Sequence, residues 1–140
     1  MPLDRLTPAG LFDARANHHS QGTVVPAGPL ALFSGQIALR EGEATPPDLP
    51  GQVGMVARNL KACLDSVGAA PDDIALLRIY VTDMAEAMTA KALSPLFDFL
   101  GDAYPSMTGI GVTALATPDL KVEIEMTVAV PGRADGHRPV

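Results

Sequence analysis

Two carboxylates near the C-terminal end of the chain, Glu123 and Glu125, have the spacing of an acid/base pair. They lie in residues 121–130, where polar and apolar side chains alternate strictly, as is typical of a half-buried β-strand. Because every second residue of a strand points to the same side, both carboxylates share one face and the apolar residues share the other. Such a pair is either a solvated surface or a site for general acid and base catalysis.

Two adjacent histidines, His18 and His19, are the other side chains suited to proton transfer. Imidazole titrates near neutral pH, so His19 is a candidate acid or base, although the pair could equally belong to a plain surface loop. Adjacent histidines are poorly placed to bind one metal ion, and the third histidine, His137, lies in the tail. The one cysteine, Cys63, excludes an internal disulfide and fits a buried core position. We therefore expect no metal and no cofactor.

Five segments have the composition and periodicity of strands that could position these groups. They are residues 23–25, 30–39, 74–81, 108–114 and 121–130. The first two are separated by Pro26, Gly28 and Pro29 and are predicted to form a hairpin. Gly35, inside the second, marks a β-bulge or a place where another group approaches the backbone closely. The near-continuous apolar run 74–81 predicts a central strand that is covered on both faces.

A first helix is predicted between the second and third of these strands. Apolar residues recur at three-and-four spacing from Val53 to Val67, which is typical of an amphipathic helix. Asp48 is a candidate N-cap, and Gly68 ends the pattern.

A second helix is predicted after the third strand. Asp83 and Glu86 have the spacing of a capping box, but Pro95 lies inside the apolar pattern that follows. A proline in a helix interior removes a hydrogen bond, so we expect a kink or a restart near Ser94. Residues 1–22 are polar and predicted to be irregular.

Composition sets the size and the surroundings of these elements. The chain has 140 residues, of which 47% are hydrophobic and only 19% charged. We expect one domain over residues 1–130 and a disordered tail over residues 131–140. The apolar content predicts a mixed sheet with two helices packed on one face and a second copy of the chain covering the other.

The charge of the chain limits its partners. Its formal net charge is −6 and its pI is about 4.8, whereas nucleic-acid binders carry basic patches. We therefore expect no nucleic-acid partner. No apolar run approaches about 18 residues and no leader pattern is present, so we expect a soluble cytoplasmic protein with no membrane partner.

Four segments, taken in order, resemble the RidA family of proteins, also called the YjgF family. They are residues 32–37, 59–62, 80–84 and 122–125. The resemblance implies an α+β fold of the chorismate-mutase-like type, assembled as a homotrimer with ligand sites between subunits. It also implies hydrolysis of reactive enamines and imines, such as 2-aminoacrylate, without a metal or cofactor.

The resemblance also suggests roles for individual residues. Glu123 matches the family glutamate that positions water or acts as acid/base, and Gly35 and Gly109 match positions whose backbone lines the ligand. Ser34 supplies the adjoining hydroxyl. His19 stands in a His-Ser-Gln segment where the family usually has Tyr-Ser-Gln.

The chain departs from the family pattern at Met107. The family binds the substrate carboxylate with an arginine in a Pro-x-Arg-Thr segment, which here reads Pro105-Ser106-Met107-Thr108. A thioether cannot form the charge-assisted pair that a guanidinium makes with a carboxylate, a loss of about 1.5–3 kcal/mol. Arg78 is a candidate replacement cation, and a structural ion pair is the alternative role for it.

Two hypotheses follow. In the first, a RidA-like trimer acts by acid/base catalysis on a small enamine, imine or related electrophile and is not a standard 2-aminoacrylate deaminase. The expected site consists of Glu123 and His19 as catalytic residues, with Ser34, Gly35, Met107 and Gly109 binding the small-molecule ligand. The alternative is a non-catalytic ligand-binding or interaction trimer of the same fold, in which Met107 fills the pocket. Ribonuclease activity, attributed to some family members, conflicts with the acidic charge.

Overall fold

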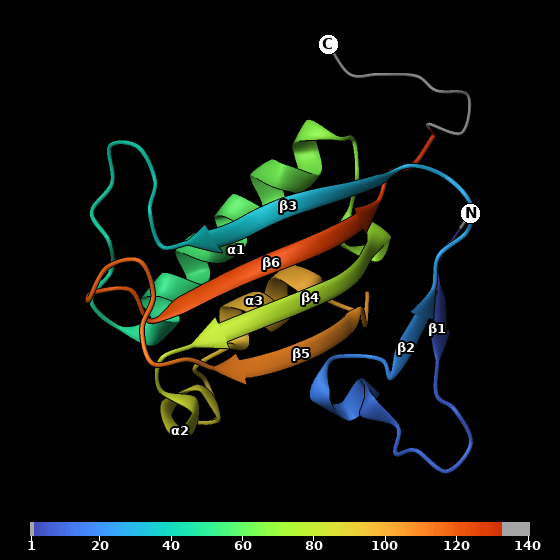
Figure 1. Cartoon of the computed structure of the whole chain (residues 1–140), viewed down its shortest axis with the longest axis horizontal. Coiled ribbons are helices and arrows are strands. Elements are labelled where there is room, and N and C mark those ends of the chain that lie inside the picture. The colour runs from blue at the N-terminus through green and yellow to red at the C-terminus, as the bar shows by residue number, and fades with distance from the viewer. Residues whose placement is uncertain (1, 133–140) are drawn as a thin grey trace.

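A four-stranded mixed sheet is the main layer of the protein (Figure 1). In the computed structural model, which describes residues 2–132, its strands are β3 (Leu30–Ile37), β4 (Ile74–Val81), β5 (Ser106–Gly111) and β6 (Val122–Ala129). Their order is β3-β6-β4-β5, with β4 and β5 parallel and the other neighbours antiparallel. These four strands were predicted from the sequence. Of the predicted tail, residues 133–140 lie outside the described residues.

The two faces of the sheet differ in composition, and β6 shows why. Its apolar row packs into the core, with no member more than 2% exposed: Val122, Ile124, Met126 and Val128. Glu123 and Glu125 lie on the opposite face and are half-buried, which confirms the predicted alternation. β4 is central in the strand order, as predicted. Within one chain only one of its faces is covered, because Arg78 on the other face is exposed.

Two helices cover one face of the sheet and leave the other open (Figure 1). They are α1 (Leu49–Ser66) and α3 (Ser94–Leu100), which pack against each other. α1 begins after Asp48, whose side chain accepts a hydrogen bond from the N–H of Gly51, and Gly68 follows its end with a φ of +66°. Both boundaries were predicted. Between residues 2 and 132 no helix is long and apolar enough to cross a membrane.

The second predicted helix is divided in two. Asp83 caps α2 (Met84–Ala87) by accepting a hydrogen bond from the N–H of Glu86. The chain then turns and restarts as α3, with Pro95 in its first turn, where the missing N–H of proline costs no hydrogen bond. The predicted restart near Ser94 is confirmed.

The predicted hairpin of residues 23–25 and 30–34 is wrong. β2 (Gly22–Val24) pairs with β1 (Asp4–Leu6) in a separate two-stranded sheet, and β3 pairs with β6. Prolines have no N–H for a strand ladder, so the proline-rich linker carries the chain from one sheet to the other. The prediction that residues 1–22 are irregular is also wrong, because they contain β1 and a short 3-10 helix, η1 (Ala14–Asn17).

Arg5 fastens the small sheet to the main one. Its guanidinium donates hydrogen bonds to the carbonyl oxygens of Ala103 and Ile74, at 3.0 and 2.8 Å, and to the Thr23 hydroxyl at 3.0 Å. Burial lowers the pKa of Arg5 from its ordinary value. A single arginine in a polar segment has no periodicity, which is why the sequence did not indicate this anchor.

Gln52 on α1 connects two loops to the helix layer. Its side chain is fully buried and donates hydrogen bonds to the carbonyl oxygens of Pro46 and Asp119, at 3.0 and 2.8 Å. It accepts one from the N–H of Lys121 at 2.8 Å. All three partners are backbone groups, so Gln52 fixes the entry into β6.

Asn59, two turns further along α1, fixes the end of β3. Its amide donates to the carbonyl oxygens of Ile37 and Leu39, at 2.9 and 3.3 Å, and accepts from Arg40 Nη1 at 2.8 Å. Ile37 is the strand partner of Glu123 in the β3–β6 register. The two amides of α1 therefore hold the backbone on both sides of this glutamate.

Replacing Gln52 by leucine is expected to lower the free energy of unfolding by roughly 2–4 kcal/mol, because three backbone groups lose their hydrogen-bond partner in the interior. Urea unfolding followed by circular dichroism measures this change. Lys61→Leu on the same helix is the control, since the Lys61 side chain is 65% exposed and its removal should change stability by less than about 1 kcal/mol. Equal losses in the two variants would contradict the role of Gln52.

Candidate functional site

Glu123 lies against the backbone of Gly35. The β3–β6 register shifts between Phe33 and Gln36, which is the bulge that Gly35 predicted. A Cβ atom at Gly35 would stand 2.5 Å from Glu123 Oε2 and 2.6 Å from Glu123 Cδ, so only glycine leaves room for the carboxylate. The sequence offered a bulge or a close approach as alternatives, and both are present. Ser34 is exposed beside them on the same bulge.

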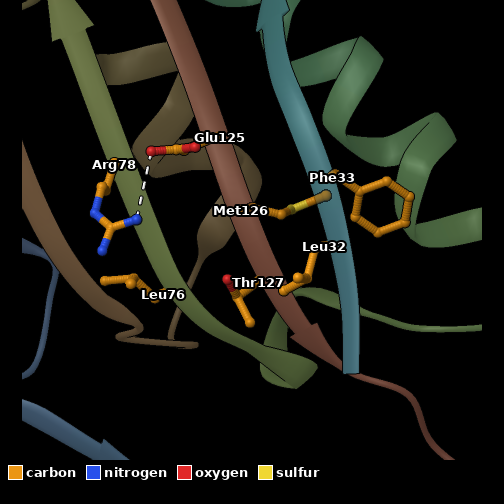
Figure 2. Close-up of a pocket in the computed structure, with 7 residues that line it drawn as sticks. All are labelled: Leu32, Phe33, Leu76, Arg78, Glu125, Met126 and Thr127. Atoms are coloured by element: carbon orange, nitrogen blue, oxygen red, sulfur yellow. Dashed lines mark hydrogen bonds and ion pairs between the residues drawn. The ribbon is translucent and has the colours of Figure 1, made fainter. Parts of the chain in front are cut away.

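Glu125, two residues along β6, has a different environment. Its carboxylate accepts a hydrogen bond from the Tyr80 hydroxyl. It also forms an ion pair with Arg78, with 3.5 Å between Nη1 and Oε1 (Figure 2). The hydrogen bond to Glu125 raises the pKa of Tyr80, and desolvation adds to the effect. Between residues 2 and 132 no side-chain hydrogen bond or ion pair engages Glu123. The two carboxylates are therefore not equivalent.

Arg78 is not placed to replace the missing arginine within one chain. It projects from the open face of β4, where Figure 2 shows it beside Glu125. The hollow around this pair measures about 170 Å³ and includes Leu32, Leu76 and Thr127. Pockets for small molecules usually measure about 300–1,000 Å³, so this hollow is too small by itself. Of the two sequence interpretations, the structural ion pair is the one observed.

Met107 and Gly109 line a larger cavity on the other side of the sheet. In the parallel β4–β5 register they pair with Leu77 and Ile79, whose side chains are buried under the helices. The cavity measures about 550 Å³ and is bounded by β4, β5, α2, α3 and the segment that follows η1. Met107 forms part of its wall rather than filling it.

The cavity is lined mainly by apolar side chains. Met84 and Met88 contribute from the α2 region and Leu93 and Phe97 from the start and middle of α3. None of the residues that line it is Asp, Glu, Lys or Arg. Met84 and Met88 are spaced about one helical turn apart. This spacing is visible in the sequence, but it is equally typical of residues that pack in the core.

The two histidines reach this cavity from the N-terminal segment. His18 has a φ of +66°, and its ring stacks on Phe97 with 4.2 Å between the ring centroids. Next to it, His19 is half-buried, and its Nδ1 lies 3.0 Å from the carbonyl oxygen of Asn17. Both histidines are among the residues that line the cavity.

Ser20 holds the histidine segment against β5. Its hydroxyl donates a hydrogen bond to the carbonyl oxygen of Tyr104 at 2.7 Å, and its N–H donates to that of Pro105 at 3.2 Å. Ser20 also forms an isolated parallel bridge to Ser106. The sequence placed Ser20 in the His-Ser-Gln segment but did not reveal this anchoring, because its partners are more than 80 residues away.

The six predicted site residues thus fall into two groups. Glu123, Ser34 and Gly35 meet at the β3–β6 bulge, on the open side of the sheet. The cavity between β5 and the helices receives the other three, which are His19, Met107 and Gly109. One chain does not bring the two groups together.

No cluster in residues 2–132 has three or more His, Cys, Asp or Glu side chains placed to hold a metal ion. Cys63 is half-buried on α1 and packs against the core, and desolvation raises the pKa of its thiol. A thiol of that kind favours the protonated form, so Cys63 is not an activated nucleophile.

Comparison with known proteins gives consistent matches along most of the chain. The family model described as Endoribonuclease L-PSP matches residues 12–130. The RutC family protein YjgH of Escherichia coli is 32% identical over 121 residues, which cover 84% of this chain and 88% of YjgH.

Solved structures of the same family superpose on the fold. YyfB from Yersinia pestis, a protein of unknown function in the conserved Rid protein family, has a TM-score of 0.78 and 28% identity over 92% of this chain and 99% of its own. Rv2704 from Mycobacterium tuberculosis, a member of the YjgF/YER057c/UK114 family, has a TM-score of 0.64 and 26% identity over 91% and 99% of the two chains.

The agreement of the family model, the relative and the structures with the α+β fold described above shows that this chain belongs to the RidA (YjgF) family.

Proposed function

We propose that three copies of the chain form a ring, in which the Glu123 group of one subunit meets the His19 and Met107 group of the next. The joint pocket then hydrolyses a small imine, enamine or related electrophile by acid/base catalysis. The observation that carries this proposal is the division of the site residues between two sides of one sheet. In a closed ring with threefold symmetry each contact joins two different surfaces, so the two groups can complete each other.

The open face of the sheet supports self-association. Leu30 and Leu32 on β3 are 51% and 76% exposed, and neighbouring Leu76 borders the same surface. Large apolar side chains grouped on one face are typical of a surface that another molecule covers. A second copy of the chain would bury them and would also enclose Glu123.

Glu123 suits the catalytic role better than Glu125. An acid/base group must exchange its proton with the substrate, and Glu125 is already engaged by Tyr80 and Arg78. Glu123 has no such partner within the described chain, and its carboxylate lies in the space that the missing side chain of Gly35 leaves open. It could therefore activate the water that attacks the carbon of a C=N bond and pass the proton to the nitrogen.

The residues that line the cavity suit a substrate that has no carboxylate. A substrate carboxylate needs a cation or several donors when it leaves water, and none of the described residues that line the cavity is lysine or arginine. The thioether of Met107 stands where the family resemblance places an arginine. The same lack of positive charge gives no support to an RNA substrate, whose phosphates bind lysine and arginine.

Self-association is tested by Leu32→Glu. A carboxylate at this exposed position should leave the single chain folded but should disrupt an assembly that buries it, because an unpaired buried charge is costly. Light scattering coupled to gel filtration should give the mass of a trimer for the unaltered protein and a smaller mass for the variant. Leu11→Glu, at a position that is also exposed but belongs to none of the strands, should remain trimeric. A monomeric unaltered protein would contradict the ring.

The acid/base role is tested by Glu123→Gln beside its matched control, Glu125→Gln. Amine oxidases and amino-acid oxidases can generate imines in the assay. Semicarbazide traps the imine that has not been hydrolysed, so the loss of trapped product measures hydrolysis by the protein. Glu123→Gln should lower kcat by about 100-fold or more while the trimer persists, since it removes the proton-transfer group. Glu125→Gln should act mainly on stability or assembly. Equal activity of Glu123→Gln and the unaltered protein would remove Glu123 from the mechanism.

The close approach of Gly35 and Glu123 is tested by Gly35→Ala. The added methyl group would overlap the carboxylate and displace it, so turnover should fall by at least about tenfold even if the protein folds. Gly54→Ala in α1 is the control, because its Cβ would meet an ordinary contact of 3.8 Å to Pro95. Retained turnover in Gly35→Ala would show that the position of the Glu123 carboxylate is not critical.

A further inference from the structure

We propose that the substrates are imines derived from primary amines, of the form R–CH=NH with an apolar R group and no carboxylate. This inference rests on the proposed function and names its substrate class. It also places the protein in a reaction sequence, because such imines are the direct products of two-electron oxidation of a primary amine.

The first argument is the charge of the cavity. The described residues that line it supply mainly apolar walls, two imidazoles and the uncharged polar side chains of Asn17 and Thr89, with no Asp, Glu, Lys or Arg among them. An imine that comes from an amino acid carries a carboxylate, which would lose its water here without gaining a cation. An imine that comes from a simple amine carries no such group. In its protonated form it is a cation, which the net charge of −6 attracts.

The second argument is the hydrogen-bond direction at His19. Its Nδ1 lies 3.0 Å from the carbonyl oxygen of Asn17, which can only accept, so Nδ1 carries the hydrogen. In the neutral ring Nε2 then has a free lone pair and acts as an acceptor. An imine N–H can donate to it, whereas a carboxylate oxygen has no hydrogen to offer. His19 is thus matched to the nitrogen end of the substrate.

The third argument is the size of the cavity and the flexibility of the side chains that line it. The cavity of about 550 Å³ has room for a phenyl or short alkyl group beside the C=N unit. Met84 and Met88 are 37% and 74% exposed, and together with Met107 they bring three flexible thioethers to one space. Methionine side chains adapt to apolar groups of different outline, so R can vary.

The reaction balances without a co-reactant other than water. Water adds to the imine carbon while Glu123 of the neighbouring subunit takes one proton from the water and delivers it to the nitrogen, which gives the carbinolamine R–CH(OH)–NH₂. Glu123 then takes the hydroxyl proton of the carbinolamine and delivers it to the nitrogen as the C–N bond breaks, so that R–CH=NH + H₂O becomes R–CHO + NH₃. Nothing is oxidised or reduced. The preceding reaction must therefore release a free imine, and the following reaction must consume an aldehyde.

Binding of two isosteric probes tests the substrate class without relying on catalysis. Benzamide has an N–H donor and no charge, whereas benzoate has nearly the same shape and carries a carboxylate. Calorimetry with the trimer should give a Kd for benzamide at least about tenfold lower than for benzoate, since no cation pairs with the carboxylate. Equal Kd values, or tighter binding of benzoate, would overturn the inference.

Met107→Arg is the decisive variant. A guanidinium at this position should reverse the preference and favour benzoate by about tenfold or more. Met107→Leu is its matched control and should keep the preference for benzamide, because it retains an apolar side chain of similar volume. Thermal unfolding of both variants checks that they fold. A failure of Met107→Arg to improve benzoate binding would show that Met107 does not face the ligand.

The rates at which two different imines are hydrolysed distinguish a failure of this inference from a failure of the proposed function. The imine released from 2-phenylethylamine by a flavin amine oxidase should be hydrolysed at least about tenfold faster than 2-iminopropionate released from alanine by an amino-acid oxidase. Faster hydrolysis of 2-iminopropionate would refute the substrate class and leave the imine-hydrolase function in place. Hydrolysis of neither compound would refute both.

Discussion

The buried amides of α1 are the constraint on which the site depends. Backbone groups at the end of β3 and at the entry into β6 lie under the helix layer, where an unpaired donor or acceptor is costly. Asn59 satisfies the carbonyl oxygen of Ile37, and Gln52 satisfies the N–H of Lys121. Because Ile37 is the register partner of Glu123 and Lys121 lies two residues before it, a shift of the Glu123 backbone would disturb both contacts.

That fixed backbone gives two glutamates on one face of one strand different environments. Glu125 meets Tyr80 and Arg78 from β4, so its charge is used in the structure. Glu123 meets the bulge of β3, where Gly35 presents no side chain, and its carboxylate has no side-chain partner among residues 2–132. The difference comes from the neighbouring strands, since the two residues themselves are chemically identical. Environment, rather than residue type, separates a structural carboxylate from a candidate catalytic one.

The sequence predicted what local patterns determine and missed what distant contacts determine. The strand around Glu123, the helix behind Asp48 and the restart at Pro95 follow from periodicity, capping and the missing N–H of proline. The pairing of β2 with β1 does not, because Arg5 secures that small sheet through partners such as Ile74, 69 residues away. For the same reason the sequence indicated Gly35 and Met107 as unusual positions but did not show that they lie on opposite sides of the sheet.

In the proposed ring, a site divided between two chains links assembly to specificity. If the Glu123 group supplies the proton transfer and the cavity group supplies recognition, then each can change without altering the backbone that holds the other. Met107 lies on β5, an edge strand, whereas the backbone of Glu123 is set by α1 and β3. A substitution at the edge can therefore remove the cation that would bind a carboxylate while the acid/base group keeps its geometry. In the proposed function the acid/base group is therefore kept while the molecules on which it acts are changed.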